Sequence, residues 1–119
     1  MTELHDLTLL GLTAQMRARR VSPVEATQAQ LDRIVALDGA LCSYATVMAE
    51  AALAEARTAE TEIRRGEHRG PLHGAPIAVK DLCWTKGVPT AAGMAIHWGF
   101  VPTEDATVVR RQRQAGAVI

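Results

Sequence analysis

Apolar residues recur every three or four positions along the first half of the chain, which is the spacing of amphipathic helices. The first such run places Leu9, Leu12 and Met16 on one face, and Thr8 stands where an N-cap is needed. Arginines follow at the end of this run, where positive charge suits the negative end of the helix dipole. We therefore predict a short helix that begins after Thr8.

A second helix is predicted by the motif "SPVE", Ser22 to Glu25. Ser22 can cap the helix, a proline is favoured in the first turn, and Glu25 can return a hydrogen bond to the backbone of the cap. This helix should stop near Asp38–Gly39. It would carry one apolar stripe, made of Val24, Thr27, Leu31, Ile34 and Val35.

The segment from Ala49 to Gly66 gives the strongest helix prediction, because it is dense in Ala and Glu. Its final glycine follows two arginines and provides a stop signal. Before it lies "LCSYATVM", Leu41 to Met48, whose β-branched and aromatic residues favour an extended segment. Residues 1–66 are therefore predicted to be mainly helical.

The pattern changes after Gly66, where glycine and proline become frequent around one apolar run, Ala75 to Lys80. Helix signals return after Pro102. Thr103 is a candidate cap, acidic residues follow it, and Gly116 stops the segment. We therefore expect loops, one buried extended run and a further helix in this half.

The last residues, Ala117 to Ile119, are typical of a buried strand. A helix, a glycine and a buried strand in this order indicate a parallel sheet flanked by helices. We therefore assign the chain to the α/β class, with residues 67–119 as the start of the core. Two strands cannot bury both faces of a sheet, so residues 1–119 are interpreted as the N-terminal portion of one larger domain.

Composition limits the partners that the chain can have. Its 13 basic and 13 acidic residues balance, so no electrostatic footprint for nucleic acid or an anionic membrane is present. No apolar run approaches the roughly 20 residues of a membrane span. Cys42 and Cys83 lack the spacing of zinc ligands and are interpreted as reduced thiols. We expect a cytoplasmic protein without a metal or cofactor.

The apolar run "PIAVKD", Pro76 to Asp81, ends in a lysine and an aspartate. Side chains alternate across an extended segment, so Lys80 shares a face with Ala78 and is turned away from Asp81. A lysine in apolar surroundings is a candidate proton acceptor, because desolvation disfavours the charged form. An exposed lysine at a strand end is the alternative. The motif lacks the Gly-Lys-Ser/Thr order of a phosphate-binding loop.

Other reactive side chains in this half lack partners in the sequence. His73 and His97 are each isolated in a loop and are interpreted as structural. Cys83 has no histidine at a useful spacing, so a buried thiol is a simpler interpretation than a nucleophile. Lys80 is therefore the principal candidate for chemistry.

Three stretches resemble the amidase signature family: "GPLHGAPIAVKD" from Gly70, "TKGVPTAAG" from Thr85 and "DATVVRRQRQAGAVI" from Asp105. The resemblance runs without gaps from Gly70 to Ile119, and the helical half fits as well. It implies an α/β/α sandwich with a mixed central sheet. It also implies hydrolysis of the C–N bond of a small carboxylic amide, or ammonia transfer in the A subunit of a tRNA-dependent amidotransferase.

The resemblance further implies a Ser–Ser–Lys triad in which Lys80 is the lysine. In the family, one serine attacks the amide carbonyl, and a second serine, on a cis peptide, relays its proton to the neutral lysine. Backbone N–H groups of a loop rich in glycine and serine bind the oxyanion. The serines of this chain, Ser22 and Ser43, do not lie in a Gly-Gly-Ser-Ser context. The chain carries the base without its nucleophile, so we expect it to be inactive alone.

Departures from the family pattern bear on specificity. Gly93 and Met94 are the candidate substrate-binding residues, and Met94 stands where many members carry serine, which predicts a less polar pocket wall. The stretch "KDLCWTKG" also differs from the "KDNI" of the tRNA-amidotransferase subunits. A bacterial amidase is therefore the favoured hypothesis. The alternatives are a non-enzymatic remnant that self-associates as a homo-oligomer through a sheet edge, and the A subunit of an amidotransferase.

Overall fold

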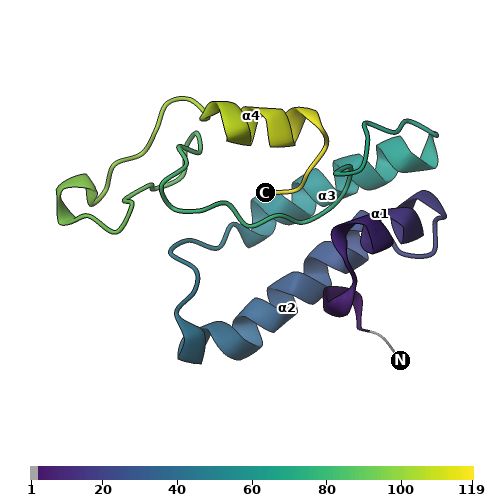
Figure 1. Cartoon of the computed structure of the whole chain (residues 1–119), viewed down its shortest axis with the longest axis horizontal. Helices are drawn as coiled ribbons and strands as arrows, with labels where there is room; N and C mark the ends of the chain where they lie inside the picture. Colours follow the sequence, from purple (N-terminus) through teal and green to yellow (C-terminus); the bar gives the residue numbers. More distant parts are fainter. Residues whose placement is uncertain (1–2) are drawn as a thin grey trace.

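The computed structural model describes residues 3–119, and its regular elements are helices. The 3-10 turn η1, Leu4–Asp6, precedes α1, Leu9–Arg17, and α2, Pro23–Leu41. A third helix, α3, spans Ala49–Arg64. Helices α2 and α3 lie side by side, and α1 lies at the end of this pair where α2 begins (Figure 1). In residues 3–119, no helix combines the length and the apolar content needed to cross a bilayer.

The predicted N-caps at Thr8 and Ser22 are confirmed. The hydroxyl of Thr8 accepts a hydrogen bond from the N–H of Gly11 at 3.1 Å. Ser22 and Glu25 form the full capping box, with donor–acceptor distances of 3.0 and 2.8 Å. These bonds satisfy N–H groups that a helix start leaves free, so local sequence sets where α1 and α2 begin.

Helix α2 is longer and less buried than predicted. It continues past Gly39 to Leu41 and ends at Cys42, whose φ of 51° is left-handed. Val35, a member of the predicted buried stripe, is 85% exposed, whereas Ala26 near the helix start is buried. The stripe prediction is wrong at Val35, because the buried contacts with α1 and the end of α3 gather near the start of α2.

The predicted Ala-rich helix is confirmed as α3. It buries one face made of small residues and one isoleucine: Ala52, Ala56, Ala59 and Ile63. The side chain of Val118 packs against Ala52 and Ala56. Small side chains thus let the extended end of the chain approach the helix closely.

The last helix begins later than predicted. Helix α4 spans Thr107–Gln114 and has Ala106 at its N-cap position, so the assignment of Thr103 as the cap is wrong. The acidic residue Asp105 instead accepts a hydrogen bond from the backbone N–H of Lys86 at 2.7 Å. Helix α4 therefore begins without a side-chain cap, and Asp105 binds a distant loop.

The predicted strands are present only as short extended segments. Among residues 3–119, sheet pairing is limited to one parallel bridge between Pro76 and Val118. The N–H of Ile77 donates to the carbonyl of Val118 at 2.8 Å, and the N–H of Val118 donates to the carbonyl of Ala75 at 2.9 Å. The pairing is parallel, as expected, but the regular mixed sheet is not confirmed. A pair of extended segments without further strands beside it is marginal.

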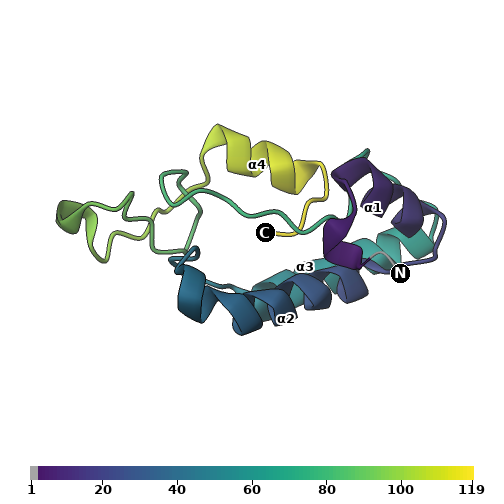
Figure 2. The ribbon, with the colours of Figure 1, turned by 60° about the horizontal axis from the view of Figure 1, so that its bottom comes forward.

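The two extended segments run between α4 and the α2–α3 pair (Figure 2). Val109 of α4 and Val118 are both fully buried. The order of helix, extended chain and helix agrees with the predicted layers. Residues 91–101, which include the 3-10 turn η2, Ala95–His97, project away from these layers (Figure 1). Ile96 and Trp98 in this segment are 87% and 88% exposed.

Candidate active site around Lys80

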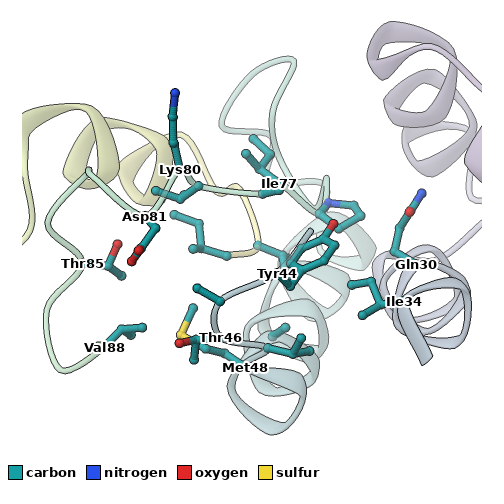
Figure 3. A pocket seen from close by; sticks show the side chains of 18 of the residues that line it. Gln30, Ile34, Tyr44, Thr46, Met48, Ile77, Lys80, Asp81, Thr85 and Val88 are labelled. Carbon is teal, nitrogen blue, oxygen red and sulfur yellow. The ribbon is translucent and has the colours of Figure 1, made fainter. Parts of the chain in front are cut away.

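A cavity of about 790 Å³ opens beside the segment that carries Lys80. Its walls come from α2, from the extended residues 43–48 and 76–81, from the loop residues 83–90 and from the chain end (Figure 3). Ile34, Met48 and Ile77 are among the apolar residues that line it. The size and the apolar lining match those of cavities that hold small ligands.

Lys80 lies at the rim of this cavity. Its side chain is exposed, and its amine points away from Thr46 and Met48 on the opposite wall (Figure 3). The sequence suggested an apolar setting for the amine, and the described part of the chain does not provide one. The side chain of Asp81 points in the opposite direction from that of Lys80, as predicted from the alternation of side chains along an extended segment.

Asp81 connects the lysine segment to the loop that carries the predicted substrate-binding residues. Its Oδ1 accepts a hydrogen bond from the N–H of Ala91, and its carbonyl accepts one from the N–H of Ala92, both at 3.1 Å. These bonds hold Ala91 and Ala92, the residues directly before Gly93 and Met94, against Asp81. Both residues are exposed and lie outside the cavity lining, and their assignment to substrate binding stays a prediction.

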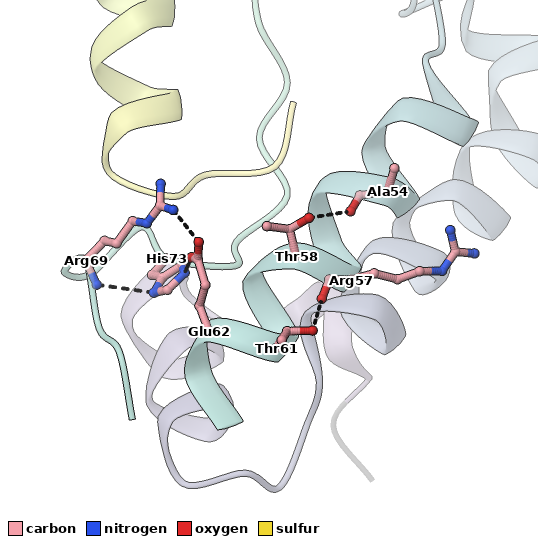
Figure 4. Close-up of polar contacts among 7 residues, drawn as sticks. All are labelled: Ala54, Arg57, Thr58, Thr61, Glu62, Arg69 and His73. Carbon is pink, nitrogen blue, oxygen red and sulfur yellow. Dashed lines mark hydrogen bonds and ion pairs between the residues drawn. The ribbon is translucent and has the colours of Figure 1, made fainter. Parts of the chain in front are cut away.

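His73 is buried in a cluster that holds the lysine segment against α3 (Figure 4). Its Nδ1 accepts a hydrogen bond from the backbone N–H of Arg69 at 3.2 Å, and its Nε2 lies 2.8 Å from a carboxylate oxygen of Glu62. Because Nδ1 accepts, the ring proton is on Nε2 and is donated to Glu62. The guanidinium of Arg69 pairs with the same carboxylate. The structural interpretation of His73 is confirmed.

The threonines next to this cluster do not take part in it. The hydroxyls of Thr58 and Thr61 donate to carbonyls one turn earlier in α3, those of Ala54 and Arg57 (Figure 4). Glu62 is therefore the residue of this helix face that reaches the loop.

A second polar network joins α3, α4 and the chain end. The guanidinium of Arg113 pairs with Glu55 and lies 3.3 Å from a carboxylate oxygen of Asp105. The other carboxylate oxygen of Glu55 accepts a hydrogen bond from the N–H of Ile119 at 2.9 Å. The partners are up to 64 residues apart, so no local sequence signal could have indicated this network.

The remaining nucleophile candidates have separate places. Ser22 is engaged in the cap of α2, whereas Ser43 is exposed and lines the cavity. Cys83 also lines the cavity and is only half-buried, so the prediction of a buried thiol is wrong. Within residues 3–119, no three His, Cys, Asp or Glu residues gather in a metal-binding cluster.

Residues 25–119, which include Lys80 and the whole loop-rich half, match the family model named Amidase. The chain belongs to the amidase family. AmiD of Mycobacterium tuberculosis, provisionally named an amidase, is 52% identical over 113 residues, which are 95% of this chain and 24% of AmiD. The A subunit of the glutamyl-tRNA(Gln) amidotransferase of Anaeromyxobacter dehalogenans is 47% identical over 121 residues, covering 99% of this chain and 25% of that protein.

A solved member of the amidase family has the same arrangement of elements. The native peptide amidase from Stenotrophomonas maltophilia matches with a TM-score of 0.88 and 40% identity, over 95% of this chain and 23% of that one. The chain thus spans about a quarter of the length of the relatives that it matches. The likeness covers the helical half and the lysine segment together.

Proposed function

We propose that this chain forms the lysine-bearing part of an amide-hydrolysing site in which Lys80 is the terminal base. The observation that carries the proposal is the place of Lys80, which lies within the matched family region and at the rim of an apolar cavity. The substrate class would be small carboxylic amides. We propose that Gly93 and Met94, which lie outside the lining of the cavity, contact the substrate where it enters. Such a site uses proton transfer and needs neither a metal nor a cofactor.

In the proposed reaction, a serine hydroxyl attacks the amide carbonyl and passes its proton through a second serine to the amine of Lys80. The lysine then returns the proton to the amine, which departs as the C–N bond breaks and leaves an acyl-serine ester. Water cleaves this ester, which releases the carboxylic acid and restores the serine. Lys80 must be neutral to accept the proton, so further polypeptide has to cover its exposed amine and exclude water. The two free cysteines are in keeping with a reducing compartment, and we propose that the protein acts in the cytoplasm.

The serines of this chain are not proposed as the nucleophile. Ser22 is engaged in the helix cap, and Ser43 follows α2 in a segment that lacks the glycine-rich context of an oxyanion loop. Residues 1–119 would therefore supply the base alone. The isolated 119-residue chain is expected to hydrolyse no amide.

The test uses the longest natural polypeptide that contains these residues and compares Lys80→Ala with Lys86→Ala. Lys86 is the other lysine of the chain, is also exposed, and uses its backbone rather than its side chain to bind Asp105. For Lys80→Ala we expect kcat/KM on small amides to fall by about 10²–10⁴, the usual contribution of a general base. Undiminished hydrolysis by a folded Lys80→Ala protein would remove the proposed role.

A second candidate function is generation of ammonia in a tRNA-dependent amidotransferase. It is favoured by the 47% identity to the A subunit of such an enzyme over 99% of the chain. Co-purification with partner proteins and amidation of a mischarged glutamyl-tRNA would support it. Hydrolysis of free amides without such partners would favour the plain amidase.

A non-enzymatic association module is the remaining alternative. The exposed Ile96 and Trp98 provide apolar surface for self-association. Size-exclusion chromatography at several protein concentrations would test this alternative. A monomer at all concentrations would rule it out.

A further inference from the structure

We propose that Asp81 is a positioning residue that fixes the turn of residues 91–94 against the segment carrying Lys80. The catalytic consequence rests on the proposed function of Lys80. The structural part rests on the contacts of Asp81 alone.

Asp81 holds the turn by two bonds of different origin. Its side-chain Oδ1 accepts from the N–H of Ala91, and its backbone carbonyl accepts from the N–H of Ala92, each at 3.1 Å. Asp81 is half-buried, so water competes only partly for its carboxylate. One residue thus satisfies two consecutive N–H groups where the chain enters the turn. The carbonyl bond persists in any variant of Asp81, and the Oδ1 bond depends on the side chain.

The turn itself has an unfavourable backbone. Ala92 has a φ of +52° and Gly93 a φ of +70°, and the N–H of Met94 donates to the carbonyl of Ala91 at 2.9 Å. Both central residues are therefore left-handed, which suits glycine but strains alanine because of its Cβ. A strained residue persists only where its surroundings hold it. The side chain of Asp81 is the group that binds the residue directly before Ala92.

The position of Asp81 gives this contact a consequence for the site. Asp81 follows Lys80 directly in the chain, and the turn that it holds presents Gly93 and Met94. Asp81 thus links the proposed base to the turn that carries the proposed substrate-contacting residues. Loss of the Oδ1 bond would shift these residues relative to the base and weaken the binding of substrate.

A direct charge effect of Asp81 on Lys80 would be a different role. The two side chains leave the chain in opposite directions (Figure 3), so the geometry favours the turn over the lysine as the partner of the carboxylate. Asp81→Asn separates the two roles. Asparagine keeps an oxygen that can accept from Ala91 and removes the charge, whereas Asp81→Ala removes both.

The first readout is amide hydrogen exchange, measured by NMR on the natural polypeptide. Asp81→Ala should accelerate exchange at Ala91 by about tenfold, the loss expected for one hydrogen bond, and Asp81→Asn by less than about threefold. Glu104→Ala, which removes an exposed carboxylate after the loop, and Lys80→Ala should leave exchange at Ala91 unchanged. Unchanged exchange in Asp81→Ala, or equal acceleration in Asp81→Asn, overturns the proposal.

The second readout is a double-mutant cycle with Ala92→Gly. Glycine relieves the strain at φ +52°, so the turn should depend less on Asp81. Asp81→Ala should then accelerate exchange by less than about threefold in the Ala92→Gly background. Equal effects in both backgrounds would show that Asp81 does not hold the strained turn, and would overturn the proposal.

The kinetic readout separates this proposal from the proposed function. Asp81→Ala should raise KM for small amides by about fivefold or more and change kcat by less than about twofold, because the residue touches no reacting atom. A fall in kcat alone overturns the positioning role. If Lys80→Ala keeps full activity while the exchange results hold, the proposed function is lost and the structural part of this proposal stands.

Discussion

The two halves of the chain depend on contacts of different range. In residues 3–66, the helix starts are set by residues three positions apart, as in the bonds of Thr8 with Gly11 and of Ser22 with Glu25. In residues 67–119, the arrangement depends on partners such as Arg113 and Glu55, which are 58 residues apart. The half that carries Lys80 is therefore the one that local signals specify least. The predictions that follow test this contrast.

The largest loss of stability is expected for a substitution of Gly116, whose backbone packs against the buried side chain of His73. The φ of Gly116 is +81°, and an added Cβ would lie 2.5 Å from Cδ2 of the histidine. We expect Gly116→Ala to lower the free energy of unfolding by about 3 kcal/mol or more, from backbone strain and overpacking together. Denaturant unfolding followed by circular dichroism measures the change.

The matched control for this substitution is Gly87→Ala. Gly87 has a similar φ of +76°, but nothing lies within 4 Å of an added Cβ. It should lose only the backbone contribution, about 1 kcal/mol. Equal losses at the two glycines would show that packing against His73 does not stabilise the fold.

The next effect is expected for the bonds between the two halves. Glu62→Ala removes the acceptor of the buried Nε2–H of His73 and the partner of Arg69, so we expect a loss of about 2–3 kcal/mol. Glu60→Ala, on the same helix, breaks a pair with the exposed Arg64 and should cost no more than about 0.5 kcal/mol. Chemical denaturation of both variants compares them, and a similar loss for each would contradict the special position of Glu62.

The smallest effect is expected for a purely local signal. Ser22→Ala removes the side-chain half of the capping box and should lower the free energy of unfolding by about 1 kcal/mol. Ser43→Ala changes an exposed hydroxyl and should have almost no effect. Thermal unfolding compares the melting temperatures of the two variants. An unchanged melting temperature of Ser22→Ala would contradict the stabilising role of the cap.

Sequence reasoning succeeded where a residue and its partner are close in the chain. The caps at Thr8 and Ser22 and the end of α3 before Gly66 follow from such pairs. It failed at Val35, because periodicity does not show which part of a helix other elements cover. It failed at Thr103, since α4 begins without a side-chain cap and the nearby Asp105 accepts a hydrogen bond from a distant loop. The burial of an apolar stripe depends on what packs against it.

The sequence indicates Lys80 as a candidate for the site but indicates none of the contacts that hold its segment in place. Lys80 is indicated by the motif and by the family resemblance. The sequence indicates no role for Asp81, because its partners at Ala91 and Ala92 become neighbours only when the loop folds back. A strained φ at an alanine cannot be anticipated from composition, since alanine rarely adopts it.

Chemical modification offers the most direct test of Lys80 as the base. Lys80 and Lys86 are the lysines of this chain. Lys86 is exposed, and an amine-reactive reagent small enough to enter the proposed amide site should also reach the covered amine of Lys80. Peptide mass spectrometry can follow both modifications in the natural polypeptide while amide hydrolysis is measured. The account predicts that activity falls in step with modification of Lys80, that Lys86 has no influence, and that a saturating amide protects Lys80. Full activity after complete modification of Lys80 would contradict it.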